Sequence, residues 1–180
     1  MSKFLPTAIA ACALLLAADR ASAKEATELN NDVSQSLREL YAHSPSAREL
    51  AAKSNGILVF PSVYKAGLGV GGSYGEGALL SGDNVVGYYN IVSGSVGWQI
   101  GAQRQSVVIM FLTPEAYRRF VDSPGFKVGV DGSVTVLDVG AGKSIDTNTL
   151  QQPIVGFIFS ESGLMAGLTL EGSKITEIAK

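Results

Sequence analysis

The sequence predicts an α+β protein in which two N-terminal helices precede a curved, mostly antiparallel, glycine-rich sheet or barrel-like core with one inserted helix. Two observations lead to this fold class. All 21 glycines lie between Gly56 and Gly172, whereas the preceding residues contain none, so the architecture changes abruptly near residue 55. Beyond that point, short apolar runs alternate with turn residues and leave room for a single helix, which favours an antiparallel sheet over a doubly wound one.

Residues 1–23 have the features of a secretory signal peptide. An apolar run over residues 4–18 follows one lysine, and Ala21-Ser22-Ala23 has the small-residue pattern of a cleavage site. We therefore expect a single mature domain of residues 24–180, exported to the periplasm, the outer membrane or the cell surface. Ile9-Ala10-Ala11-Cys12 resembles a bacterial lipobox, so the alternative is a lipoprotein acylated on Cys12.

The helical segment of the mature chain spans residues 24–54. Leu29, Val33, Leu37 and Leu40 recur at a spacing of three to four residues, which is typical of an amphipathic helix. The dipeptide Ser44-Pro45 divides the segment, because serine is a good N-cap and proline suits the first helical position of a second, shorter helix.

From Gly56 onward the sequence predicts consecutive strands and the inserted helix. That helix is TPEAYRRFVDS, with Thr113 as its N-cap, Pro114 at its first position and Pro124-Gly125 as its stop. A final hairpin turns at residues 160–163. The predicted strands cover residues 57–60, 66–80, 85–91, 95–103, 107–112, 127–130, 133–139, 154–159 and 164–170.

The segment AGLGVGGSYGEGALL, residues 66–80, contains two enzyme motifs, GxGxxG and GxSxG, and satisfies neither. Both motifs require a helix directly after the glycine turn, and Gly75 and Gly77 each cost a helix about 1 kcal/mol relative to alanine. The only histidine, His43, precedes Ser73, whereas the hydrolase order places it after the serine. We expect no catalytic residue, no cofactor and no metal site. A hydrolase that brings two carboxylates together in space is the remaining enzymatic alternative.

Glycine instead alternates along this segment, at positions 67, 69, 71, 75 and 77. One face of the predicted strand is therefore bare, and a bare face allows close approach of a helix, a neighbouring sheet or an acyl chain. Close internal packing in a strongly curved sheet is the interpretation we favour.

The charge balance argues against a nucleic-acid partner. Without Lys3, Asp19 and Arg20 of the signal peptide, 12 basic and 15 acidic residues remain, a net charge of −3. Nucleic-acid binders normally have a basic excess.

Several sequence blocks, taken in order, resemble the SYLF domain family over about residues 49–178. They are Lys53-x-x-Gly56-Ile57, Pro61-x-Val63-x-Lys65-Ala66-Gly67, Gly71-Gly72-x-x-Gly75-x-Gly77, Gly94-x-x-Gly97-Trp98-Gln99-Ile100-Gly101-Ala102-Gln103, VIMFLTPEAYRRF, GVDGSV and SESGLMAGLTLEGSKI. The resemblance implies a lipid-binding domain without catalysis. Eukaryotic members bind phosphoinositide membranes and yeast members also bind actin, whereas bacterial members are mostly secreted or envelope proteins. This sequence has Ser73 where the eukaryotic members tend to have an arginine.

We therefore interpret the chain as a non-enzymatic module that binds phospholipid membrane at the bacterial cell envelope. Two groups of residues are candidates for headgroup contact, because a surface cation is worth about 1 kcal/mol against an anionic leaflet. Trp98, Tyr88 and Tyr89 belong either to the interface or to the core. The alternative is an envelope structural or protein-interaction module, an actin-binding-like scaffold without lipid affinity. The candidate groups are Arg48, Lys53, Tyr64 and Lys65 near the first strand, and Arg118 and Arg119 on the inserted helix.

Overall fold

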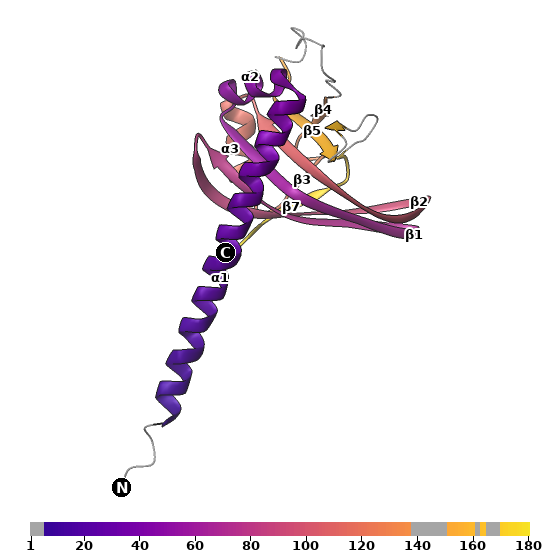
Figure 1. The fold of residues 1–180 in the computed structure, drawn as a ribbon. Helices are drawn as coiled ribbons and strands as arrows, with labels where there is room; N and C mark the ends of the chain where they lie inside the picture. The colour runs from indigo at the N-terminus through magenta and orange to yellow at the C-terminus, as the bar shows by residue number, and fades with distance from the viewer. Residues whose placement is uncertain (1–5, 138–150, 161–162, 165–169) are drawn as a thin grey trace.

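The computed structural model describes residues 6–137, 151–160, 163–164 and 170–180, and within these ranges it describes no side-chain surroundings for residues 6–24, 67–70, 95–102 and 163–164. The order of elements is α+β, as the sequence predicts, with the helices α1 and α2 ahead of the sheet and α3 inserted within it (Figure 1). The elements are α1 (Pro6–His43), α2 (Pro45–Lys53), β1 (Gly56–Ser81), β2 (Asn84–Phe111), α3 (Pro114–Val121), β3 (Phe126–Lys127), β4 (Thr135–Val136), β5 (Ile154–Ser160), β6 (Gly163–Leu164) and β7 (Lys174–Ile178).

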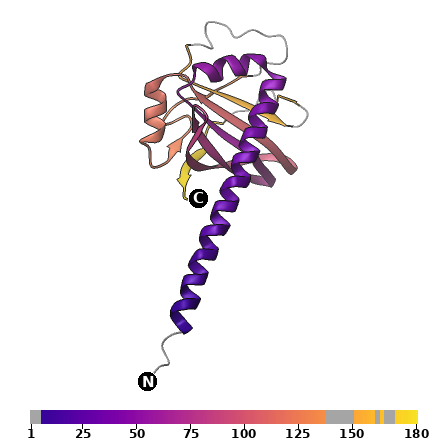
Figure 2. The same cartoon turned by 60° about the vertical axis from the view of Figure 1, so that its left-hand side comes forward.

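The two N-terminal helices cover one face of the sheet. Ser44 caps α2 as predicted, because its Oγ accepts a hydrogen bond from the backbone N–H of Ala47 at 3.3 Å. The stripe predicted to be apolar packs inward: Val33 and Leu40 are buried, and Leu29 and Leu37 lie partly buried against the same cluster. α1 therefore lies across the strands with its apolar side against them (Figure 2). The outer cluster consists of Val33, Leu40, Ala47, Leu50, Val59, Ala78, Val108, Met110, Val155, Phe157 and Phe159.

β1 and β2 form one long antiparallel ribbon that folds back on itself. The ribbon starts at the pair Gly56↔Phe111, ends at Ser81↔Asn84, and contains three register shifts. Its two halves lie face to face, since a Cβ placed on Gly75 would come within 2.7 Å of the carbonyl oxygen of Ser62. Figure 1 shows the folded ribbon projecting beyond the other strands. We call this projection, residues 64–74 of β1 with residues 92–104 of β2, the arm.

The remaining strands extend the two halves of the ribbon. The second half of β2 pairs with β5, the first half pairs with β7, and β7 pairs with β3. β6 continues β5 as the predicted hairpin, through Phe159↔Leu164 and Ser160↔Gly163. β4 is the exception to the antiparallel pattern, because it pairs in parallel with β5. The result is a curled, mixed sheet that forms a half-barrel.

The interior of the half-barrel is filled by a second apolar cluster, which α3 closes. Successive strand side chains point to opposite faces, so Leu58 and Phe60 enter this inner cluster whereas Val59 enters the outer one. At its centre the Phe120 ring of α3 lies 5.0 Å from Tyr89, 4.8 Å from Phe111 and 5.4 Å from Phe126, measured between ring centroids. Both faces of the central strands are therefore buried.

The glycines at positions 75 and 77 serve close internal packing, as expected. A Cβ on Gly77 would overlap the carbonyl oxygen of Val59, and a Cβ on Gly75 would meet the same half of β1. The first half of β1 therefore packs directly against the glycine face of the second half. At Gly75 and Gly77 no room remains for an acyl chain. The side-chain surroundings of positions 67 and 69 lie outside the described residues.

The strand boundaries differ from the prediction at several places. β3 and β4 are each two residues long, whereas the predicted strands there cover residues 127–130 and 133–139. The segments 57–60 and 66–80 are one strand, β1, and the three segments between residues 85 and 112 are one strand, β2. The predicted break between residues 60 and 66 of β1 coincides with a register shift between Phe60 and Val63, whereas the pairing is regular across the predicted break at residues 92–94 of β2. β7, whose residues pair with Tyr88 to Val92, was not predicted. Residues 138–139 and 165–169 of the predicted strands lie outside the described part of the chain.

α1 runs without a break from Pro6 to His43 and so includes the predicted cleavage site after Ala23. The surroundings of the Cys12 side chain lie outside the described residues. Within the part of the chain that the structure describes, no helix combines the length and the apolar character needed to cross a bilayer.

Candidate functional site

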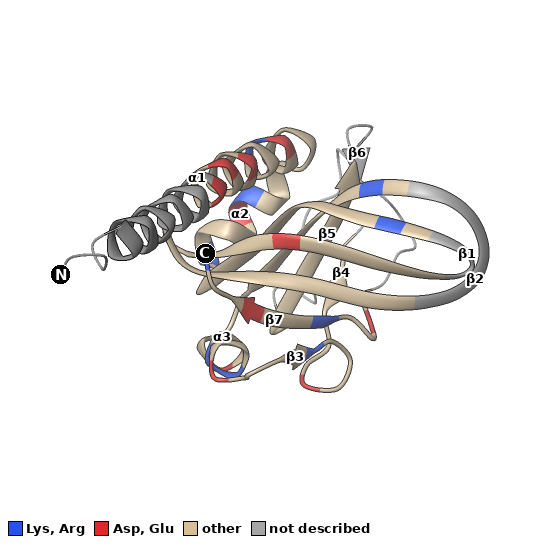
Figure 3. Ribbon diagram, turned by 90° about the horizontal axis from the view of Figure 1, so that it is seen from below, with Lys and Arg blue, Asp and Glu red and all other residues tan. Residues whose placement is uncertain are grey.

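The six predicted contact residues lie on three separate elements and do not form one cluster. Arg48 and Lys53 lie on α2, and Tyr64 and Lys65 lie on β1. Lys65 is nine residues beyond the start of β1, up to about 30 Å away at the rise of an extended strand. Arg118 and Arg119 lie on α3, whose apolar side faces the inner cluster, whereas α2 packs on the outer one. Figure 3 shows α2 and α3 on different sides of the sheet.

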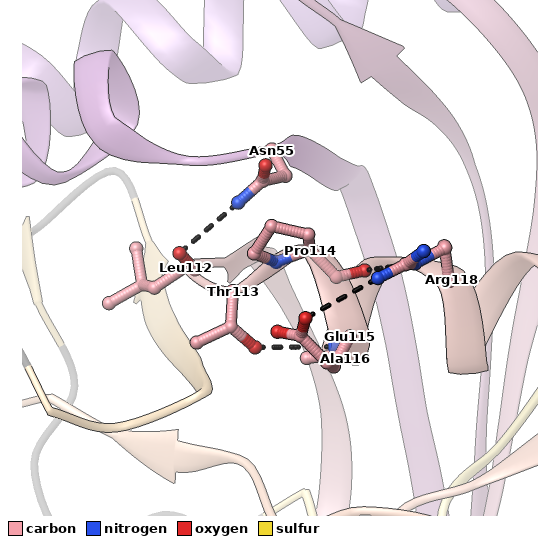
Figure 4. A network of polar contacts seen from close by, with 7 residues as sticks. All are labelled: Asn55, Leu112, Thr113, Pro114, Glu115, Ala116 and Arg118. Atoms are coloured by element: carbon pink, nitrogen blue, oxygen red, sulfur yellow. Dashed lines mark hydrogen bonds and ion pairs between the residues drawn. The ribbon is translucent and has the colours of Figure 1, made fainter.

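Two of the predicted cations make contacts within the fold. The guanidinium of Arg48 lies 5.5 Å from the centre of the Tyr41 ring of α1, a cation–π distance. Arg118 folds back along its own helix, where its Nε donates to the carbonyl oxygen of Pro114 at 3.4 Å and its Nη2 lies 3.3 Å from Glu115 Oε1 (Figure 4). These two arginines therefore have structural partners, and they are weaker candidates for headgroup contact than Lys65 of β1.

The same view shows how the chain enters α3. Thr113 Oγ1 accepts a hydrogen bond from the N–H of Ala116 at 3.2 Å, as predicted for its N-cap (Figure 4). Asn55 Nδ2 donates to the carbonyl oxygen of Leu112 at 3.1 Å and ties the start of β1 to the end of β2.

The arm brings together the strongest set of contact residues. Tyr64 is 60% exposed and pairs directly across the ribbon with Arg104, so the two side chains share one face. Lys65 emerges on the other face, opposite Gln103. Arg104 was not among the predicted residues, and its Nε donates to Ser62 Oγ at 2.9 Å, which leaves its terminal nitrogens free to bind an anion. Lys65 of β1 and Arg104 of β2 therefore lie on the two neighbouring strands of the arm.

The returning half of the arm is also partly apolar at its surface. Tyr74 and Val92 form a cross-strand pair, with exposed fractions of 47% and 45%. In the next cross-strand pair of the same half, Ser73 Oγ and Ser93 Oγ lie 2.6 Å apart in a hydrogen bond. Ser73, where eukaryotic relatives tend to have an arginine, is therefore paired with a neighbouring serine and adds no charge.

The other predicted membrane elements are part of the core. Tyr89 is buried beside Phe120, and burial raises the pKa of its phenol to about 12. Tyr88 packs on the outer cluster and accepts a hydrogen bond from Asn30 Nδ2 at 3.1 Å. The apolar side of α1 packs on the sheet, so it is not free to enter lipid. The Trp98 side chain lies outside the described residues.

A polar groove of about 380 Å³ opens at the base of the arm, between α1 and the second half of β2. Asp32 and Glu39 of α1 line one side of the groove, and Arg104 of β2 lines the other side. Gln35 Nε2 donates to Glu39 Oε1 at 2.9 Å, which leaves Glu39 Oε2 for another partner. The lining residues are Asp32, Gln35, Ser36, Glu39, Pro61, Arg104, Gln105, Ser106 and Ser160.

A second charged contact joins three distant segments of the chain. Lys180 Nζ lies 2.7 Å from Glu76 Oε2 of β1 and 3.7 Å from Glu25 Oε2 of α1. The hydrogen bond from Lys180 is the main cause of a lowered pKa at Glu76, and the same bond raises the pKa of Lys180. This contact holds Glu25 of α1, the returning half of β1 and residue 180 together.

The two carboxylates that line the groove do not lie on opposite sides of it. Asp32 and Glu39, the two in the groove, come from the same wall and are seven residues apart on one helix, a rise of about 10 Å. A glycosidase pair flanks its bond from two sides at about 5–9.5 Å. Among the described residues, no three His, Cys, Asp or Glu side chains converge as metal ligands.

Taken together, the described residues form a helix-covered half-barrel with an exposed basic and aromatic arm. One comparison with known families found a match. Residues 92–180 match the Ysc84 family model, described as Las17-binding protein actin regulator, so this part of the chain belongs to the Ysc84, or SYLF, domain family. The match starts within β2, and β1 joins the matched residues along the whole ribbon. No curated protein matched the chain.

Proposed function

We propose that this protein is a non-enzymatic phospholipid-binding module that attaches to anionic membrane through its arm. The observation that carries the proposal is the pair formed by Tyr64, an exposed aromatic side chain, and Arg104, with Lys65 on the opposite face of the same strand. Among the described residues, neither cation has a carboxylate partner in an ion pair.

The physical basis is local attraction on a molecule that is weakly acidic overall. The formal net charge of −2 gives no general attraction to an anionic surface. Each cation near such a surface contributes about 1 kcal/mol, and an amphipathic ring such as tyrosine is favourable at the headgroup level. An arm that projects beyond the other strands can enter the headgroup layer with cations on both faces.

The test is co-sedimentation of the full chain with phosphatidylcholine vesicles that contain or lack phosphatidylglycerol, at low ionic strength. We expect binding only with the anionic lipid, and we expect the double variant Lys65→Gln/Arg104→Gln to bind roughly thirtyfold more weakly, from two losses of about 1 kcal/mol. The matched control is Lys53→Gln/Arg119→Gln, which removes the same charge from α2 and α3.

Equal losses in both double variants would show that net charge, and not the arm, determines binding. No binding to any vesicle would favour the second function, a protein-interaction module. The description of the matched family as Las17-binding supports that alternative, which would require a protein partner in the envelope.

We further propose that the protein is exported, on the strength of the signal-peptide features of residues 1–23. The mature protein would then begin at Lys24, or at an acylated Cys12 if the lipobox is used.

A further inference from the structure

We propose that the polar groove at the base of the arm is a binding site for a zwitterionic phosphoethanolamine headgroup, the headgroup of phosphatidylethanolamine. This inference rests on the proposed function, because it names the lipid that the membrane-bound arm would place beside the groove.

The first step is the separation of charge across the groove. Asp32 and Glu39 lie on the α1 wall and Arg104 lies on the β2 wall. No ion pair within 4.0 Å joins Arg104 to either carboxylate in the described structure. The opposite charges therefore face the groove without neutralising each other, and a ligand that carries both signs can bridge them.

The second step is the chemistry that these side chains recognise. A guanidinium binds phosphate through charge-assisted hydrogen bonds. A primary ammonium group has three N–H donors and needs acceptors, and the α1 wall supplies them at Asp32 or at the free Oε2 of Glu39. A choline headgroup has the same charges but no N–H donor, so the site should discriminate against it.

The third step is the size and lining of the groove. About 380 Å³ lies near the lower end of the range for small-molecule sites, about 300–1,000 Å³. Eight of the nine lining residues are polar or charged and the ninth is Pro61, so the groove suits a headgroup and not an acyl chain. Arg104 belongs to both the groove and the arm, which places the groove where a headgroup layer would meet the protein.

The test uses the full chain and vesicles with a fixed fraction of phosphatidylglycerol, in which the remaining lipid is either phosphatidylethanolamine or phosphatidylcholine. We expect at least about tenfold tighter binding to the phosphatidylethanolamine vesicles, because charged hydrogen bonds are lost with choline. The double variant Asp32→Asn/Glu39→Gln should lose this preference and keep its binding to phosphatidylglycerol. Glu49→Gln/Asp83→Asn is the charge-matched control and should keep the preference.

Equal binding of the wild-type chain to both vesicle types would overturn the inference. A preference that survives in Asp32→Asn/Glu39→Gln would overturn it as well, since the effect would then come from bilayer packing. Soluble phosphoethanolamine should compete for the vesicle-bound chain, and phosphocholine should not.

Failure of the proposed function gives a different result. If the chain binds no vesicle, including anionic ones, the membrane proposal fails. Direct binding of soluble phosphoethanolamine by NMR titration in that case would identify a free zwitterion as the ligand and would overturn the lipid assignment.

Discussion

Replacing Gly77 with alanine should destabilise the fold far more than the same change at Gly94. The new Cβ at position 77 would overlap the carbonyl oxygen of Val59 and come within 2.6 Å of Phe60 Cδ1. Overpacking costs about 1–3 kcal/mol, and we expect about 3 kcal/mol here, because the atom in the way is backbone and cannot rotate aside. For a chain of this size that loss lowers the melting temperature by about 6–12 °C.

Gly94→Ala is the matched control, since it lies in the same ribbon and no atom lies within 4 Å of its added Cβ. We expect it to leave the free energy of unfolding unchanged or to raise it by up to about 1 kcal/mol. Urea and thermal unfolding followed by circular dichroism would measure both variants. A Gly77→Ala protein as stable as Gly94→Ala would refute the face-to-face packing of the two halves of β1.

Three further predictions concern charge, capping and processing. Because the pKa of Glu76 is lowered by Lys180, their contact stabilises the fold above the ordinary glutamate pKa of 4.5 and is lost as the pH falls through the lowered value. Glu76→Gln should therefore reduce the free energy of unfolding at pH 7 by less than about 1 kcal/mol, since the glutamate is partly exposed, and the difference from wild type should vanish in urea titrations at strongly acidic pH. Thr113→Ala should cost about 1 kcal/mol in the same assay by removing the N-cap of α3, and Thr113→Ser should restore most of it. Mass spectrometry of the protein from its native cells should give an N-terminus at Lys24, or an acylated Cys12, and an unprocessed Met1 would contradict export.

Local chemistry made the helices predictable. Ser44 and Thr113 cap their helices as expected, because capping depends on one side chain and the three residues that follow it. The apolar stripe of α1 follows from the helical period alone, and it packs on the sheet. The packing role of Gly75 and Gly77 followed from their alternation, although the sequence did not say which segment would approach them.

The register of the long ribbon could not be predicted, and the contact site was incomplete for that reason. If the pairing at Ser81↔Asn84 continued without a bulge, Tyr64 would lie opposite Gly101. Two register shifts, between Leu79 and Leu80 and between Gly67 and Gly69, place it opposite Arg104 instead. A bulge inserts an extra residue into one strand and leaves the pairing on either side of it intact. The sequence around a bulge therefore contains no pattern that predicts its position. The same limit explains why the pairing of β7 with β2, which joins segments far apart in sequence, was missed.

The packing of α1 determines which surface remains for a ligand. Because Val33, Leu37 and Leu40 are used by the outer cluster, α1 cannot lie in a membrane with its apolar face while the fold is intact. With the apolar residues of α1 turned toward the sheet, the adjacent polar residues of the helix lie at the base of the arm. There Asp32 and Glu39 face Arg104 across the groove. The amphipathic pattern therefore has two consequences: it builds the outer core, and it sets one charged wall of the groove. Under the proposed function, this packing would leave membrane attachment to the arm and headgroup selection to the groove beside it.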